Sequence, residues 1–355
     1  MSTRFPALRR AVTAAAAAAA LALLGACGST NGGASGDHGT GDGTAGKTGV
    51  IVPLLTSPFW QAYKDYIPVK ARESGVSTLP TVNSDSDAAQ QITDMNNLLN
   101  QGVKGLVVAP IDSAAIAAGL DQAQRRGVPV VAVDVAPDTG KVAMIVRADN
   151  RAYGTLACTY LGEKVTSGKV VQIMGDLAST NGRERTQAFR DCMKQNHPQI
   201  QVLEIPTEWK AEKAAAGLAA VLTANPDLRG VYMQAGGVFL APTLQQLKAK
   251  GMLHPVGDPN HITVVSNDGI PQELDAIRRG DIDATVSQPA DDYAKYGLQY
   301  IKGAMEGKAF QPGPTDHGST IVRLPNGNLQ DQLAAPLVTQ DNVDSPALWG
   351  NTVGK

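Results

Sequence analysis

Short apolar runs rich in valine, leucine and isoleucine recur along this chain, and segments with helical periodicity separate them. Three such runs are typical of strands buried on both faces of a parallel sheet: 50–55, 103–109 and 128–133. Between the first two, 85–100 carries Ile92, Met95, Leu98 and Leu99 at helical spacing and ends before a glycine. The segment 114–126 repeats this pattern, so the first half of the chain predicts βαβ units.

The same alternation resumes after Asp149-Asn150. Strands are predicted at 169–174, 201–205, 230–234, 262–266 and around Thr285. Helices are predicted between them, at 151–166, 183–196, 211–224, 238–250 and 270–279. Two successive sets of βαβ units predict an α/β protein with two doubly wound parallel-sheet lobes.

The N-terminus has the features of an export signal. Arginines at 4, 9 and 10 precede an uncharged apolar run over 11–26, which is short for a membrane span. The run ends in Leu24-Gly25-Ala26-Cys27, which resembles the lipobox of bacterial lipoproteins, where a cysteine exposed by cleavage carries a diacylglycerol. We therefore expect a signal peptide at 1–26 and lipidation of Cys27; an ordinary secretory signal with an incidental cysteine is the alternative. The arginine pair leaves open whether export follows the general or the twin-arginine route.

Residues 28–48 consist mainly of Gly, Ser, Thr, Asn and Asp. Such a segment buries too little apolar surface to offset its chain entropy, so 27–48 is predicted to be a flexible tether at the outer face of the cell membrane. The remaining residues, from 49 on, suit two domains by length. Their mixed charges, with a net charge of −2 for the whole chain, argue against nucleic acid as a partner. No second long apolar segment follows, so we expect membrane contact only through the lipid.

Two cysteines remain in the body, Cys158 and Cys192. Both fall in predicted helices that flank one strand, and an exported protein meets oxidising conditions. A disulfide between them is favoured over two buried free thiols.

Eight segments of the body resemble the sugar-binding type I periplasmic proteins, the relatives of ribose-binding proteins, in that family's order and spacing. They are SPFW (57–60), NQGVKGLVVAPIDSAAI (100–116), GVPVVAVD (127–134), ADN (148–150), NGRERTQAF (181–189), TANPDLRGVYMQ (223–234), SNDG (266–269) and ATVSQP (284–289). The resemblance covers 49 to about 323, and QDNVDSPALWGN (340–351) is more loosely similar to a polyol- and inositol-binding branch.

The resemblance implies two lobes joined by three chain crossings, with a ligand enclosed between the lobes. The crossings are expected near Arg147–Asn150, near Gln288 and near 317–319. The N-terminal lobe would then comprise 49–147 and 289–317, and the C-terminal lobe 148–288 and 318–355.

The resemblance also implies the ligand contacts, and the residue types suit the chemistry. Sugars and polyols offer apolar C–H faces to aromatic rings and a rim of hydroxyls to charged hydrogen-bonding groups. Open α/β sheets bind ligands beyond the carboxyl ends of their strands, where these candidates fall. The expected contacts are Ser57, Phe59, Trp60, Asp134, Arg147, Asn150, Arg183, Trp209, Asn267, Asp268 and Gln288.

Phe59 and Trp60, placed in a loop after a proline, are expected to stack on the ligand from one lobe and Trp209 from the other. Asp134 and Asp268 would accept hydrogen bonds, and Arg183 would donate two, whereas Arg185 is expected to be a surface charge. The alternatives are core packing for the aromatic rings and helix caps or turns for the aspartates. Gln288 and Asn150 adjoin crossings, and Asn150 could serve the hinge instead.

The chain departs from the ribose binders at several contacts. Val135 stands where they have Arg, Ala235 where they have Asn, Ser57 where Asn occurs and Asn267 where an aromatic occurs. Arg147 has no counterpart in them and could supply a cation from another direction. The smaller side chains leave room for a larger ring, so a hexose, inositol or other polyol is favoured over ribose.

The resemblance implies a solute-binding lipoprotein that serves the permease and ATPase of an ABC importer, and we expect a monomer without cofactor or metal. An enzyme is disfavoured because the sequence lacks a P-loop, a nucleophile elbow and a metal-ligand cluster. A sugar-responsive repressor is excluded because a signal peptide stands where its DNA-binding helices would be. A sensor for a chemoreceptor or kinase, or a receptor for a furanone-type signal, remains the alternative.

Overall fold

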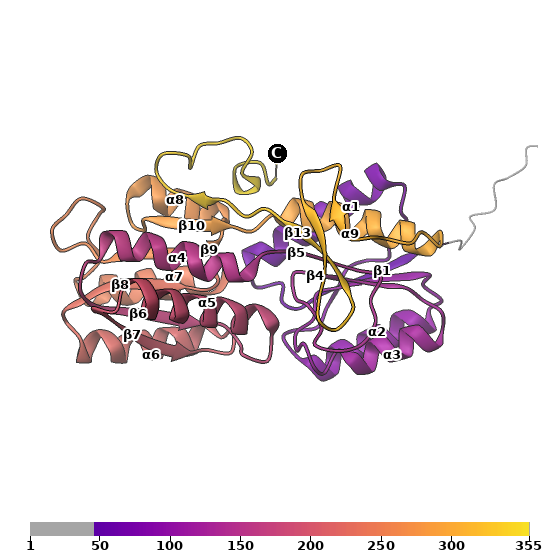
Figure 1. Cartoon of the computed structure of the whole chain (residues 1–355), viewed down its shortest axis with the longest axis horizontal. Helices are drawn as coiled ribbons and strands as arrows, with labels where there is room; N and C mark the ends of the chain where they lie inside the picture. The colour runs from indigo at the N-terminus through magenta and orange to yellow at the C-terminus, as the bar shows by residue number, and fades with distance from the viewer. Residues whose placement is uncertain (1–45, 355) are drawn as a thin grey trace, which may run out of the picture. The chain divides into compact units, whose positions relative to one another are not determined.

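The computed structural model describes residues 46–354, which belong to one compact unit, Thr44–Lys355. The predicted signal peptide, Cys27 and all but the end of the tether lie outside this range and remain predictions. The described chain forms two α/β lobes, each built on one sheet (Figure 1). No helix within 46–354 is both long and apolar enough to cross a membrane.

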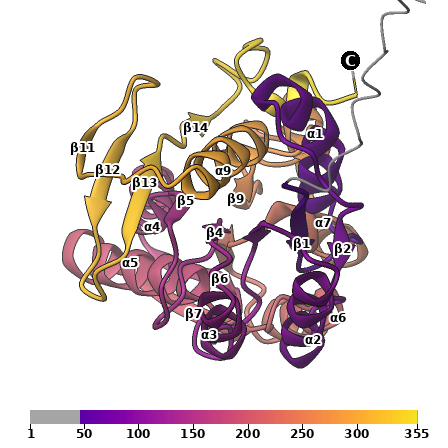
Figure 2. The ribbon, with the colours of Figure 1, turned by 90° about the vertical axis from the view of Figure 1, so that its right-hand side faces the viewer.

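Lobe one contains an eight-stranded sheet within the described residues. Its strand order is β11 (Gly313–Pro314), β12 (Thr320–Arg323), β13 (Leu329–Leu333), β5 (Met144–Ala148), β4 (Val130–Val133), β3 (Gly105–Val108), β1 (Thr48–Val52) and β2 (Val82–Asn83). The strands β2, β1, β3, β4, β5 and β13 run parallel, and β11 and β12 add antiparallel strands at one edge (Figure 2).

Helices cover both faces of this sheet. Val50 and Val52 pack in one core with α1 (Pro58–Ser74) and α9 (Ala290–Met305), whereas Ile51 between them packs with α2 (Ala88–Asn100) and α3 (Ala117–Arg125). Because successive strand residues point to opposite faces, a strand covered on both sides must be apolar throughout, which explains the uninterrupted apolar runs.

Lobe two contains a six-stranded sheet among the residues described. Its order is β14 (Leu337–Val338), β10 (Ala284–Ser287), β9 (Thr263–Asp268), β8 (Leu228–Met233), β6 (Gly168–Met174) and β7 (Ile200–Pro206), parallel except for β14. The helices are α4 (Asn150–Lys164), α5 (Thr180–Asn196), α6 (Ala211–Ala224), α7 (Gly236–Ala249) and α8 (Pro271–Arg279), followed by a 3₁₀ turn at Trp349–Asn351. One apolar core includes residues of α4 and α5, and another includes residues of α6, α7 and α8.

The third crossing differs from the prediction. It was expected near 317–319, but β12 pairs with β13, and β13 pairs with β5, in the sheet of lobe one. The chain therefore enters the second sheet only after Leu333, where β14 pairs with β10. The first two crossings fall between β5 and α4 and between β10 and α9, next to Asn150 and Gln288.

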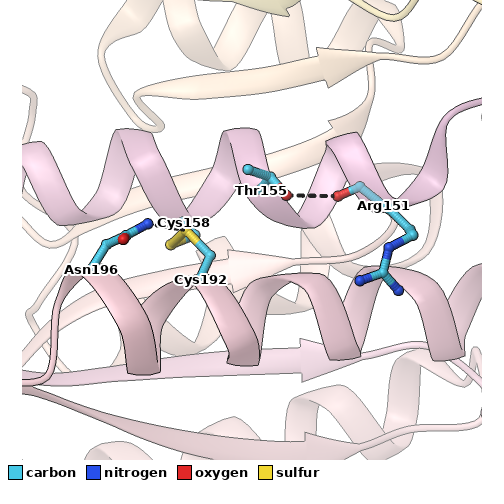
Figure 3. The surroundings of a disulfide bond; sticks show 5 residues. All are labelled: Arg151, Thr155, Cys158, Cys192 and Asn196. Atoms are coloured by element: carbon cyan, nitrogen blue, oxygen red, sulfur yellow. Dashed lines mark hydrogen bonds between the residues drawn. A yellow bond between two sulfur atoms is a disulfide. The ribbon is translucent and has the colours of Figure 1, made fainter.

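A disulfide joins Cys158 of α4 to Cys192 of α5, with the two Cα atoms 6.1 Å apart (Figure 3). The two helices run in the same direction and approach closely. A Cβ on Gly154 of α4 would lie 2.5 Å from the Arg185 carbonyl oxygen of α5, so only glycine permits this approach. The disulfide thus fixes a pair of helices that also carries side chains of the candidate site.

Candidate functional site

A cavity of about 170 Å³ is lined by loops and helix ends at the carboxyl ends of strands from both sheets. Seven of the predicted residues line it, and they come from both lobes: Ser57, Phe59, Trp60, Asp134, Trp209, Asp268 and Gln288. The lining also includes residues without a predicted ligand contact, among them Val135, Asn181, Arg185 and Ala235. This is the position at which open α/β sheets bind ligands.

Phe59 and Trp60 lie in the first turn of α1, not in a loop as predicted. Pro58 occupies the first helical position, where its fixed φ and missing N–H are tolerated, so the proline begins the helix. Both rings are largely buried, and they contact each other edge to face with centroids 5.1 Å apart. They therefore contribute to the core of lobe one and line the cavity, so the two interpretations of these aromatics are compatible.

Trp209 lines the cavity from lobe two, after β7. Its ring stacks on Phe239 of α7 with centroids 6.1 Å apart, and its indole Nε1 donates to Ser179 Oγ at 3.3 Å. A Cβ on Gly175 would lie 1.9 Å from this ring, so the glycine makes space for it. Trp349, the third tryptophan, packs against Phe59 and donates to the Asp268 carbonyl oxygen at 3.2 Å. The sequence suggested no role for Trp349, although the scarcity of tryptophan in the chain was a signal.

Asp134 and Asp268 present carboxylates from opposite lobes. Both have positive φ, 63° for Asp134 and 120° for Asp268, and the latter lies outside the usual left-handed region, so its backbone is strained. Asp134 Oδ1 accepts from Asn181 Nδ2 at 2.9 Å, and Asp268 Oδ2 accepts from the Gly237 N–H at 2.8 Å. Each carboxylate therefore keeps its second oxygen available for further hydrogen bonds.

Burial raises the pKa of the Asp134 and Asp268 carboxyls, and the positive charge of Arg185 opposes this rise. Glu273, behind Asp268 in α8, is fully buried and accepts from the Gly269 and Ile270 N–H groups and from Thr285. Burial, reinforced by the nearby Asp268, also raises the pKa of Glu273. Asp134, Asp268 and Glu273 therefore place three carboxyls in the interior, with few positive charges close by to offset the cost of their burial.

Arg185, predicted to be a surface charge, is buried and lines the cavity. Its Nε donates to Asn150 Oδ1 at 2.6 Å, its Nη2 donates to Gln288 Oε1 at 2.6 Å, and its Nη1 donates to the Gln234 carbonyl. Asn150 and Gln288 adjoin the first two crossings, so this guanidinium connects the cavity to the hinge.

Arg183, the predicted donor, does not line the cavity. Its guanidinium bonds to Asp138 and to the Leu177 and Ala178 carbonyls, and its side chain is 39% exposed. Residues two apart on a helix lie about 200° apart around its axis, so Arg183 and Arg185 face opposite ways.

Three other predicted residues do not line the cavity either. Arg147 pairs with Glu184 at 2.6 Å, and Asn150 accepts from Arg185. Asn267 is fully buried and donates to Tyr232 Oη at 2.9 Å, so it stabilises the interior of lobe two. Their ligand contacts were expected from the resemblance, which could not show these internal partners.

The family described as periplasmic binding protein domain matches residues 48–309. The ribose import binding protein of Bacillus subtilis is 27% identical over 268 residues, which cover 74% of this chain and 83% of that protein. The xylitol-binding protein of Mycolicibacterium smegmatis is 25% identical over 265 residues, which cover 74% of this chain and 68% of that protein. In fold, the chain is similar to the Caulobacter myo-inositol binding protein, with a TM-score of 0.72, 24% identity, and coverage of 86% and 97%.

Proposed function

The chain belongs to the periplasmic binding protein domain family, and on that premise we propose that it captures a neutral sugar or polyol between its two lobes. The observation that carries the proposal is the cavity itself. Aromatic rings enter it from both lobes, and two carboxylates and a guanidinium offer hydrogen bonds between them. Flat C–H faces and a rim of hydroxyls match this combination.

The charge of the lining favours an uncharged solute. The buried acidic side chains of the lining, Asp134 and Asp268, share one buried cation, Arg185, whereas the exposed Glu208 is paired with Lys210 and Lys213. A sugar acid or sugar phosphate would bring a further negative charge into this setting, whereas hydroxyls can donate to the free carboxylate oxygens.

We further propose a hexose, inositol or similar polyol in preference to ribose. Val135 and Ala235 both line the cavity, and their short side chains leave room on either side of it. The solutes for which the relatives are named, ribose and xylitol, support a sugar or polyol as the ligand class.

The remaining parts of the proposal concern delivery. We propose an exported lipoprotein, anchored through Cys27, that hands its solute to the permease of an ABC importer. The predicted signal and tether support this arrangement, which would keep a receptor close to a membrane partner. Growth on the identified solute of cells that express only a Cys27→Ser variant would test whether the anchor is needed.

Thermal unfolding of the chain from residue 44 on, against pentoses, hexoses, inositols, alditols, uronates and furanone signals, tests the binding proposal. A solute at about 100 times its dissociation constant should add about 2.7 kcal/mol to the free energy of unfolding. Asp134→Asn should abolish the shift, and Arg183→Met, outside the cavity, should preserve it. No shift with any sugar or polyol would refute the carbohydrate assignment, and stabilisation by a uronate alone would refute the neutral ligand.

A further inference from the structure

The charge of Arg147 is paired with a residue of the opposite lobe. It lies in β5 of lobe one and is 2% exposed. Its Nη2 donates to Glu184 Oε2 at 2.6 Å and to Asn181 Oδ1 at 2.8 Å, and both acceptors lie on α5 of lobe two. The contact is therefore an interlobe ion pair with an added charged hydrogen bond.

Asn181 carries this contact back to the cavity. Its Nδ2 donates to Asp134 Oδ1 at 2.9 Å, and Asp134 follows β4 of lobe one. The path from Arg147 through Asn181 to Asp134 crosses between the lobes twice. The Asp134 carboxylate is thus oriented by a residue that reaches it only when the lobes are together.

The N-terminus of α5 makes further bonds to lobe one. The Thr180 N–H donates to Ser113 Oγ at 2.9 Å, and Thr180 Oγ1 accepts from the Ala136 N–H at 3.1 Å. Every donor and acceptor in this set belongs to the chain. These bonds therefore hold the two lobes together in the arrangement described here, through groups of the chain itself.

We propose that Arg147, Asn181 and Glu184 form an interlobe clasp that positions Asp134 and favours closure before a solute binds. The inference deepens the proposed function, because it concerns how the same cavity is completed. When only part of a population is competent to bind, the apparent dissociation constant rises as that fraction falls. A clasp that raises the closed fraction therefore strengthens binding without contacting the solute.

Burial distinguishes this clasp from the neighbouring Arg183–Asp138 pair, which also joins the lobes. The Arg183 and Asp138 side chains are 39% and 37% exposed, and exposed ion pairs contribute little. Arg147 is almost fully buried, so water does not replace its partners. Arg147 is thus a positioning residue, since it acts on the solute only through Asn181 and closure.

The test measures lobe closure directly in the solute-free chain from residue 44 on. Spin labels would replace exposed valines, Val69 on lobe one and Val256 on lobe two, and the distance between them would be recorded for wild type, Arg147→Met and Glu184→Ala. The wild type should show a closed population that both variants largely lose. The matched control is Glu204→Ala, which breaks the pair of Glu204 with Arg190 of α5 inside lobe two and should leave the distance unchanged.

Solute affinity provides the second measurement. Arg147→Met and Glu184→Ala should each weaken binding about tenfold, because a charged hydrogen bond of about 1.5 kcal/mol corresponds to that factor. The double variant should be little worse than either single one, since both remove the same contact. Unchanged distances in Arg147→Met and Glu184→Ala would overturn the clasp.

If Arg147→Met does not fold, Glu184→Ala decides the question alone, because the Glu184 side chain is 33% exposed and its loss leaves no large cavity. If no sugar or polyol binds the wild type, the proposed function fails, and the distance measurement still supports or overturns the clasp.

Discussion

Replacing Arg185 with methionine should destabilise the chain strongly, whereas the same replacement at Arg183 should not. Arg185 donates three hydrogen bonds, to Asn150, Gln288 and the Gln234 carbonyl, and it opposes the raised pKa of both Asp134 and Asp268. Removing one member of a buried charged network typically costs about 3–5 kcal/mol, because the opposite charge is left without compensation.

The exposed pair of Arg183 with Asp138 should contribute about 0–1 kcal/mol. Urea unfolding followed by tryptophan fluorescence measures both variants. The loss in Arg185→Met should shrink as pH falls below the folded pKa of Asp268, about 7, because protonation of this carboxyl removes a charge that Arg185 would otherwise compensate. If Arg185→Met lowered the free energy of unfolding by less than about 1 kcal/mol, Arg185 would not be a buried charge of the site. If Arg183→Met lowered it by more than about 1 kcal/mol, Arg183 would not be an exposed surface charge.

Three further predictions concern the surroundings of the site. Replacing Cys158 and Cys192 with serine should cost about 3–4 kcal/mol, because the disulfide closes a loop with a sequence separation of 34; an unfolding midpoint unmoved by reductant would contradict this. The folded-state pKa of Glu273 is raised, so its contribution to stability is fully present below about pH 4 and falls as pH rises toward its folded pKa of about 8. Glu273→Gln should therefore flatten the dependence of the melting temperature on pH, and an equal slope in both proteins would show that Glu273 does not titrate as inferred. Gly175→Ala should displace the Trp209 ring and weaken solute binding about tenfold, roughly 1.4 kcal/mol, while the melting temperature changes little; calorimetric titration with the identified solute measures it, and unchanged affinity would exclude Trp209 as a contact.

The sequence predicted elements best where burial imposes a strict pattern. Strands such as β1 and β4 are covered on both faces, so their apolar runs were legible. The helix α1 was missed because Pro58 suggested a loop, although proline at the first helical position is common. The place of the tail strands was missed because β13 joins the sheet through β5, a segment far away in the chain, and β12 follows it as the other strand of a local hairpin.

The candidate site shows the same limit at the level of single side chains. The two arginines of the Arg-Glu-Arg sequence at 183–185 lie about 200° apart around the helix axis. Which of them faces the cavity depends on how α5 packs against the rest of the chain, and the sequence does not show this. Arg147 was predicted to contact the ligand, but it does not line the cavity, and its partner Glu184 could be identified only once both lobes were placed. Residue types at strand ends were therefore predictable, whereas the direction of each side chain was not.

The three crossings have a consequence for biosynthesis. The strand β13 pairs with β5, which the ribosome makes about 180 residues earlier, and β14 completes the other sheet only a few residues later. At a translation rate of about 5–20 residues per second, β13 is made roughly 10–40 s after β5, the strand with which it pairs. Neither lobe can complete its sheet before nearly the whole chain exists, so the two lobes must mature together, and truncation before residue 329 would damage both.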